Sequence, residues 1–296
     1  MPIHEIAAVG AATCWAVSSV ISAAPVAHLG PLAFTRIRMA MVLAMLAAWV
    51  FATGTWRTIL PEQFGLIAMS GVLGIFFGDT LLFLALSRLG PRRSSIVFST
   101  HAPMSVVLGW LLLGEALSLR ELGGVAIVTV GVVLAILFGK RRSQLHQWEE
   151  VKGPLWIGVA CGLGAALSQA GGSIIIRPVM EAGSDAVAVS AVRVGVSVCC
   201  FYAVVLAAGD RLRARNPLTW RVAGVTALSG AIAMAVGMTL VLFALSGGEV
   251  GIVATLSAMA PIVILPLIWW RTGEMPAPGA WAGAILATIG MGLIFL

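Results

Sequence analysis

Ten apolar stretches, each about 20 residues long, restrict the fold of this chain more than any other feature of its sequence. They are joined by short polar segments, and apolar and polar residues do not alternate within them. Backbone N–H and C=O groups cannot be hydrated in lipid, so such stretches cross a membrane as helices or as strands of a closed barrel. Because a barrel strand requires alternation, the sequence predicts an all-α membrane protein. The expected spans are 3–24, 31–52, 63–86, 93–113, 119–138, 154–176, 185–208, 217–245, 250–270 and 278–296.

The amino-acid composition excludes a soluble globular protein. Of the 296 residues, 60% are apolar and only 10% are charged, whereas a soluble domain has about 25% charged residues. The net charge of +6 comes from basic residues in the short connections, which indicates membrane topology rather than nucleic-acid binding. The four cysteines lie inside apolar stretches without metal-ligand spacing. We therefore expect a lipid bilayer around the chain, no nucleic-acid partner and no metal site.

The two halves of the chain resemble each other on either side of the polar segment KRRSQLHQWEEVK at 140–152. FGDTLLFLALS (77–87) aligns with VGMTLVLFALS (236–246), 159 residues further on, and the dipeptide Gly-Glu at 114–115 recurs at 273–274 with the same spacing. FTRIRMA (34–40) aligns with VSAVRVG (189–195). These matches predict a first five-helix repeat at 1–139, a polar linker at 140–152 and a second five-helix repeat at 153–296.

Five crossings are an odd number, so the second repeat must enter the membrane upside down. Inverted repeats that meet at a binding site near the bilayer midplane recur in secondary transporters. The sequence thus predicts ten transmembrane helices, arranged as two inverted five-helix repeats around a central cavity. Two such halves can exchange conformations, which is the basis of alternating access.

The basic residues are distributed unevenly between the two ends of the predicted bundle. The odd-numbered connections hold eleven Arg and Lys residues, whereas the even-numbered ones hold only Arg57, Arg120 and Arg177. Positively charged connections stay in the cytoplasm. This bias predicts a cytoplasmic linker and places both termini outside.

Asp79 is the leading candidate for a functional residue. It lies about two-thirds along the third span, and its counterpart in the second repeat is Met238. A charged side chain at the centre of a bilayer costs about 2.5–3.5 kcal/mol on insertion scales, so it normally faces a cavity or a partner. Asp79 can recognise a substrate amine or couple transport to protons, or it can join two helices by a hydrogen bond.

His101 lies midway along the fourth span, and Phe83 shares a helix face with Asp79. Histidine titrates near physiological pH, so His101 and Asp79 are candidates for a proton relay; a hydrogen bond between helices is the alternative for His101. Pro103 and Pro261 should interrupt the backbone ladder of the fourth and ninth spans, either freeing carbonyls for a site or forming a packing kink.

Other polar residues have two readings each. Trp15 and Ser19 on the first span and Gln169 on the sixth either line a cavity or bond to neighbouring helices. Arg38 and Arg193 recur at matched positions, and anchoring a helix end is favoured over gating. The chain has no phosphate-binding loop and no HExxH or GxSxG motif. We therefore expect no cofactor, no ATP-driven pumping and no catalytic residues.

The ten spans, an arginine in each second helix, a proline in each fourth helix and the Gly-Glu pair that follows it resemble the EamA family of the drug/metabolite transporter superfamily. Within this family the chain is most similar to bacterial inner-membrane exporters of aromatic and other amino acids. The resemblance implies a cavity lined by the first, third, fourth, sixth, eighth and ninth helices. Many members are drawn with cytoplasmic termini, which is opposite to the charge bias; we follow the charges.

The resulting hypothesis is export of amino acids, or of similar small amphipathic metabolites, by alternating access. Aromatic rings would bury an apolar side chain, and Asp79 would meet the ammonium group. Proton counter-transport and facilitated diffusion are both compatible with these residues. Efflux of cationic drugs, transport of another metabolite, a membrane-embedded enzyme and an assembly protein are the alternatives. The expected site consists of Trp15, Ser19, Asp79, Phe83, His101, Gln169 and Met238, shaped or gated by Pro103, Pro261, Arg38 and Arg193.

Overall fold

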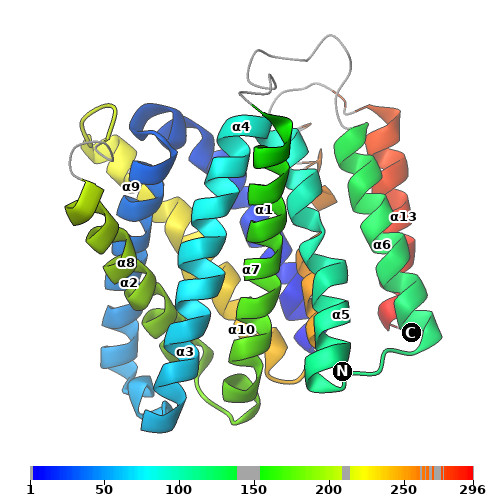
Figure 1. Cartoon of the computed structure of the whole chain (residues 1–296), viewed down its shortest axis with the longest axis horizontal. Helices are drawn as coiled ribbons and strands as arrows, with labels where there is room; N and C mark the ends of the chain where they lie inside the picture. Colours follow the sequence, from blue (N-terminus) through cyan, green and yellow to red (C-terminus); the bar gives the residue numbers. More distant parts are fainter. Residues whose placement is uncertain are drawn as a thin grey trace.

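The computed structural model describes residues 3–138, 154–208, 214–260, 262–263, 265–266, 269, 275 and 277–295. All regular elements in these residues are helical (Figure 1). The first half contains α1 (Ile3–Leu29), α2 (Pro31–Thr53), η1 (Thr55–Thr58), η2 (Pro61–Gln63), α3 (Phe64–Ser70), η3 (Gly71–Phe77), α4 (Gly78–Ser99), α5 (His101–Leu113) and α6 (Leu119–Leu137). The second half contains α7 (Leu155–Glu181), α8 (Ala186–Ala208), α9 (Trp220–Gly230), η7 (Ala231–Met238), α10 (Thr239–Leu245), α11 (Val250–Ser257) and α13 (Pro278–Phe295).

Six helical segments of the described residues are long and apolar enough to cross a membrane. Large apolar side chains, among them Trp110, Trp156 and Trp220, remain exposed on the outer surface, as contact with lipid allows. The expected all-helical membrane protein is therefore confirmed, whereas the number of ten crossings stays a prediction. The six segments are Ile3–Ser22, Leu32–Thr53, Pro61–Leu82, Leu155–Glu181, Ala186–Ala207 and Trp220–Leu245, and Val97–Leu113 and Pro278–Ile294 are shorter apolar helices.

The chain reverses direction within α4. Gly162 of α7 lies close to two residues of α4. If it carried a Cβ atom, this atom would lie 2.7 Å from the Val97 side chain and 3.8 Å from that of Ala85. Twelve residues of a straight helix would separate Ala85 from Val97 by about 18 Å. The third and fourth predicted spans thus meet in a helical hairpin, in which the backbone keeps helical hydrogen bonds through the polar segment of 87–92.

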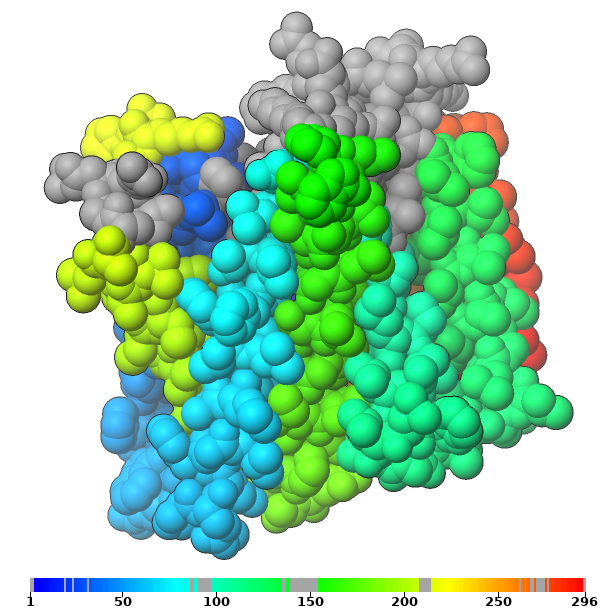
Figure 2. Space-filling view, viewed as in Figure 1, coloured from blue at the N-terminus to red at the C-terminus, as the bar shows by residue number. Residues whose placement is uncertain are grey.

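Each helix of the first half packs along a helix of the second half. α1 contacts α9, η7 and α10, and in the same way α7 contacts α3, η3 and α4. The pairs α2–α8, α5–α11 and α6–α13 complete the set, and the last pair stands side by side at one edge of the bundle (Figure 1). The space-filling view shows α7 on the outer face, between α3–α4 on one side and α5 on the other (Figure 2).

Glycines show the relative direction of α6 and α13. A Cβ atom on Gly124 would lie 2.8 Å from the carbonyl oxygen of Gly290, and one on Gly131 would lie 2.6 Å from that of Gly283. Residue numbers rise along one helix as they fall along the other, so the two helices are antiparallel. Close backbone approach at small residues is the usual way in which helices associate in lipid.

Buried apolar side chains form two main clusters between the halves. One joins residues of α1, α6, α7, α10, α11 and α13, and the other joins residues of α2, α8, η3 and η7. Trp15 packs against both clusters. The region around Trp15 is therefore where the central helices meet, and Met238 of the predicted site lies in the second of these clusters.

Candidate functional site

The third helix of each half contains a π-helical segment at the matching position. η3 spans Gly71–Phe77 and η7 spans Ala231–Met238, and the 159-residue spacing pairs Gly71 with Gly230. π-helical turns are rare and are frequently found at functional sites. Both segments accept an outside hydrogen bond: Trp15 Nε1 donates to Ala233 O at 3.0 Å, and Ser197 Oγ donates to Gly71 O at 3.0 Å.

Arg38 and Arg193, which occupy matching positions in the two halves, each lie against the π-helical region of the opposite half. A Cβ atom on Gly71 would lie 2.7 Å from the carbonyl oxygen of Arg193, and one on Gly230 would lie 3.0 Å from Cγ of Arg38. These approaches leave no room for a side chain at either glycine. The two arginines thus occupy equivalent places, exchanged between the halves.

Arg38 of α2 and Asp79 of α4 form a loose ion pair. Their side chains are 3.9 Å apart, with 12% and 18% of their surface exposed. Nε of Arg38 and Oδ2 of Asp79 are buried without a hydrogen-bond partner in the described part of the chain, and the Arg38 guanidinium lies 5.2 Å from the centre of the Phe34 ring. The pair therefore retains donors and acceptors that a ligand or water can use.

Arg193 of α8 has a different environment. The residue is 3% exposed, and its Nη1 donates to Sδ of Met238 at 3.6 Å. Its Nε is buried without a partner, and within the described residues it forms no ion pair. Met238 holds the position that corresponds to Asp79, so the second half has the arginine but not the carboxylate.

The structure brings together part of the predicted site. Arg38 meets Asp79, Arg193 meets Met238, and Trp15 packs against the cluster that contains Met238. Gly237, next to Met238, would place a Cβ atom 3.1 Å from Nε1 of Trp15. These residues come from α1, α2, α4, η7 and α8, and both halves contribute.

His101 is separate from this group. It is the first residue of α5, 3% exposed, with its ring centre 5.0 Å from that of Phe98. Nδ1 of His101 and Oγ of Ser105, one turn further along α5, are buried without a described partner. His101 makes no direct hydrogen bond to Asp79 among the described contacts, so the expected relay between them would need an intervening group.

The remaining predicted residues are placed as follows. Pro103 lies in the first turn of α5, directly after the break at Thr100 between α4 and α5. A turn at Ala258–Met259 follows α11 in the same way in the second half. Gln169 is half-buried on α7, and its backbone carbonyl accepts a hydrogen bond from Ser173 Oγ at 3.1 Å. Pro261 and the side chains of Ser19 and Phe83 lie outside the described residues.

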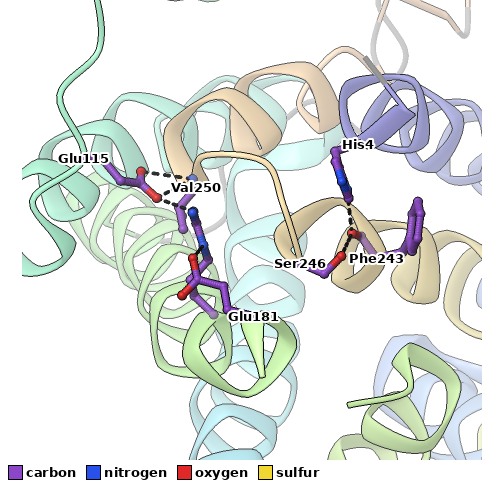
Figure 3. A network of polar contacts seen from close by, with 7 residues as sticks. His4, Glu115, Glu181, Phe243, Ser246 and Val250 are labelled. Atoms are coloured by element: carbon purple, nitrogen blue, oxygen red, sulfur yellow. Dashed lines mark hydrogen bonds and ion pairs between the residues drawn. The ribbon is translucent and has the colours of Figure 1, made fainter. Parts of the chain in front are cut away.

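A polar network at one end of the bundle joins the two halves (Figure 3). Glu115 of the repeated Gly-Glu pair accepts a hydrogen bond from Arg177 of α7. Its two carboxylate oxygens also lie 2.9 and 3.0 Å from the backbone N–H of Val250, the first residue of α11. Burial and the carboxylates of Glu121 and Glu115 raise the pKa of Glu249, and Arg177 opposes this shift.

Sequence reasoning missed three parts of this arrangement: the π-helical segments, the crossing of each arginine to the opposite half, and the role of Arg177. The matched Arg38 and Arg193 were a signal for the second, because a residue repeated in both halves can contact its symmetry-related neighbour. The π-helical segments left no signal beyond the glycines Gly71 and Gly230.

Comparisons with known proteins agree with this architecture. A solved structure titled "Crystal structure of protein" superposes with a TM-score of 0.79 at 17% identity, covering 98% of this chain and 95% of that one. No curated protein matches the sequence. The model of the EamA-like transporter family matches residues 3–137 and again residues 156–296. The chain therefore belongs to the EamA-like transporter family, with two copies of the family unit, and is a membrane transporter of small metabolites.

Proposed function

We propose that this transporter exports amino acids, or similar small amphipathic metabolites, across the bacterial inner membrane by alternating access. In this proposal ten helices form two inverted five-helix repeats around a central cavity, with residues 140–152 as the linker. The linker is cytoplasmic and both termini are outside. Helices α6 and α13 support the inversion, because they correspond to each other and run antiparallel.

The loosely paired Arg38 and Asp79 carry the proposal. Charged groups among central helices are rare in membrane proteins and mark substrate or ion pathways. A group whose only role was structural would normally have its hydrogen bonds satisfied. Here Oδ2 of Asp79 and Nε of Arg38 have no described hydrogen-bond partner, which leaves them available to a polar solute or to water.

The assignment of parts is as follows. Asp79 binds the ammonium group directly or through water, and Trp15, Phe83 and Met238 contact the apolar side chain. Ser19, Gln169 and His101 line the remainder of the path, while Pro103 and Pro261 shape the fourth and ninth helices. Arg38 holds Asp79 in place. Proton counter-transport and facilitated diffusion both remain compatible with this assignment.

Reconstitution into liposomes tests the substrate class. Purified protein is incorporated into vesicles loaded with a panel of radiolabelled amino acids, and release is compared with protein-free vesicles. We expect release of aromatic amino acids above that background, and faster release with the unlabelled amino acid outside. A protein that releases none of the panel contradicts the proposal.

Efflux of cationic drugs is the second candidate, and the charges near the centre argue against it. Arg38, Asp79 and Arg193 contribute two positive charges and one negative charge. A cation would add to the excess positive charge, whereas a solute with an acidic group reduces it. Vesicles loaded with a fluorescent cationic dye provide the comparison, and we expect no dye release above background.

A further inference from the structure

Arg193 is a buried cation without a counter-ion in the described structure. Its guanidinium has five N–H donors, yet the described hydrogen bond goes from Nη1 to Met238 Sδ at 3.6 Å, and Nε has no partner. A thioether sulfur is only a weak acceptor. Burial of a charge is unfavourable unless it is paired and hydrogen-bonded, so this arrangement is incomplete as it stands.

The other half of the molecule shows what completes such a site. Arg38, the counterpart of Arg193, lies 3.9 Å from the carboxylate of Asp79. The matching position next to Arg193 holds Met238, which contacts the guanidinium but carries no charge. Each half of the chain thus has an arginine at this place, but only the first half has a carboxylate beside it.

We propose that Arg193 binds the carboxylate of the transported solute, which takes the place that Asp79 occupies beside Arg38. This inference rests on the proposed transport function. It predicts that every solute that the protein transports carries an acidic group. Arginine is suited to the task, because its planar guanidinium binds a carboxylate through two parallel hydrogen bonds.

In this proposal a solute reaches Arg193 by displacing the side chain of Met238. Met238 covers Nη1, and its unbranched side chain can move because it has three rotatable bonds. If Gly74 carried a Cβ atom, this atom would lie 3.1 Å from Nη2. The guanidinium therefore packs against the backbone of Gly74, where no side chain intervenes. Displacement of Met238 would expose the donors toward Trp15, which packs against the same cluster.

In this proposal Asp79 is the second anchor of the solute. Gly74, which lies beside Arg193, and Asp79 are five residues apart along η3 and α4, which is less than two helical turns. A small solute with a carboxylate at one end and a cationic or hydrogen-bonding group at the other fits between the two charges. Its apolar part would then lie along Trp15 and Met238.

Two families of variants test the carboxylate site. Arg193→Met removes the charge at similar volume, and Arg193→Lys keeps the charge without the planar fork. Met238→Asp supplies an internal carboxylate that mimics Asp79 and occupies the guanidinium, and Met238→Asn has the same shape without the negative charge. Because Met238→Asp adds a partner to a buried charge rather than removing one, we expect this variant to fold.

The probes are phenylalanine, its primary amide and 3-phenylpropionate, and binding is measured as the ligand-induced rise in Tm of protein in detergent. We expect phenylalanine and 3-phenylpropionate to stabilise the wild type, and the amide, which lacks the carboxylate, to have no effect. Arg193→Met and Met238→Asp should weaken binding of both acids by about 10-fold or more, Arg193→Lys should weaken it less, and Met238→Asn should weaken it less than Met238→Asp does.

The outcomes separate this proposal from the proposed function. Equal stabilisation by phenylalanine and its amide, no stabilisation by either acid, or unchanged binding of the acids to Met238→Asp would each overturn the carboxylate site. Wild-type vesicles that release no amino acid while the protein still binds 3-phenylpropionate through Arg193 would instead overturn amino-acid export and leave the carboxylate site standing. A purely structural arginine would not distinguish the acid from its amide.

Discussion

Two ion pairs of this chain differ in how fully their hydrogen bonds are made. At the end of the bundle, Glu115 and Arg177 are 9% and 11% exposed, and Glu115 also accepts hydrogen bonds from Val250 N (Figure 3). Among the central helices, Arg38 and Asp79 are 12% and 18% exposed but lie 3.9 Å apart with unpaired atoms. Similar burial thus accompanies a saturated pair in one region and an unsaturated pair in the other.

The difference indicates which pair holds the fold and which one serves transport. Removing one partner of a saturated buried pair leaves an uncompensated charge and is strongly destabilising. The central pair makes fewer hydrogen bonds, so a substitution there removes fewer of them. Its unpaired atoms can also bind a solute. Stability and transport measurements on matched variants can therefore separate the two regions.

Glu115→Ala should have the largest effect on stability. The variant leaves Arg177 with Glu181 as its remaining described partner and removes the acceptor for Val250 N, so we expect a loss of about 3 kcal/mol. Thermal unfolding in detergent measures it. Glu181→Ala is the matched control, because Glu181 is 50% exposed and lies one turn from Arg177, which predicts a loss of about 0.5 kcal/mol. Equal losses for the two variants would contradict the assigned role of Glu115.

Gly172→Ala should disturb the contact of α7 with η3 near Arg193. Its Cβ would lie 2.7 Å from Cα of Gly74, and the backbone of η3 cannot move as a flexible side chain does. We expect a loss of about 2 kcal/mol from overpacking. Gly224→Ala of α9 has open space around the new atom and should stabilise the helix by about 0.8 kcal/mol. A Gly172→Ala variant as stable as the wild type would refute the close approach of α7 to η3.

Asp79→Asn should change transport more than stability. The substitution removes the charge from a carboxylate whose described ion pair is long, so we expect a Tm close to that of the wild type. Amino-acid release from vesicles should fall by about 10-fold, equivalent to about 1.4 kcal/mol. The variant Asp79→Met, which copies the second half of the chain, should lose transport as well. Normal transport by Asp79→Asn at every pH tested would remove Asp79 from the mechanism.

Glu249→Gln should have the smallest effect, and its sign depends on pH. The pKa of Glu249 is raised in the folded protein by burial and by Glu121 and Glu115, so its ionised form is less stable folded than unfolded. The resulting destabilisation is present above the raised pKa and disappears as the pH falls toward the ordinary carboxyl value. We therefore expect Glu249→Gln to have a slightly higher Tm than the wild type at neutral pH and no advantage in acid. An advantage that is independent of pH would show that the raised pKa is not its cause.

Much of the fold could be predicted because lipid imposes a strict rule on the backbone. Apolar stretches without alternation must be helices, and the all-helical structure and the two family units at 3–137 and 156–296 agree with that reading. The repeated sequence also showed that Arg38 and Arg193 occupy matching positions in the two halves. The hairpin within α4 also lies at the polar segment where a connection between the third and fourth spans was expected.

The site was less predictable, because it depends on contacts between helices far apart in the sequence. Asp79 was identified from the cost of a buried charge, but nothing in its surroundings predicted Arg38 as its partner. For Arg193, anchoring of a helix end was favoured over gating, and nothing in the sequence predicted that its guanidinium would lie at Met238 with the residue only 3% exposed. His101 and Asp79, which the sequence suggested as a relay, make no direct contact among the described residues.

The sequence by itself determined that this chain is a helical membrane protein with two related halves, because hydrophobicity and repetition are local properties that each segment carries alone. Tertiary structure decided which charges are compensated, because a counter-ion is defined by distance in space rather than along the chain. Packing of the two halves against each other placed Asp79 beside one arginine and Met238 beside the other. The sequence had already aligned Asp79 with Met238, but only the assembled bundle showed that each of them lies beside an arginine.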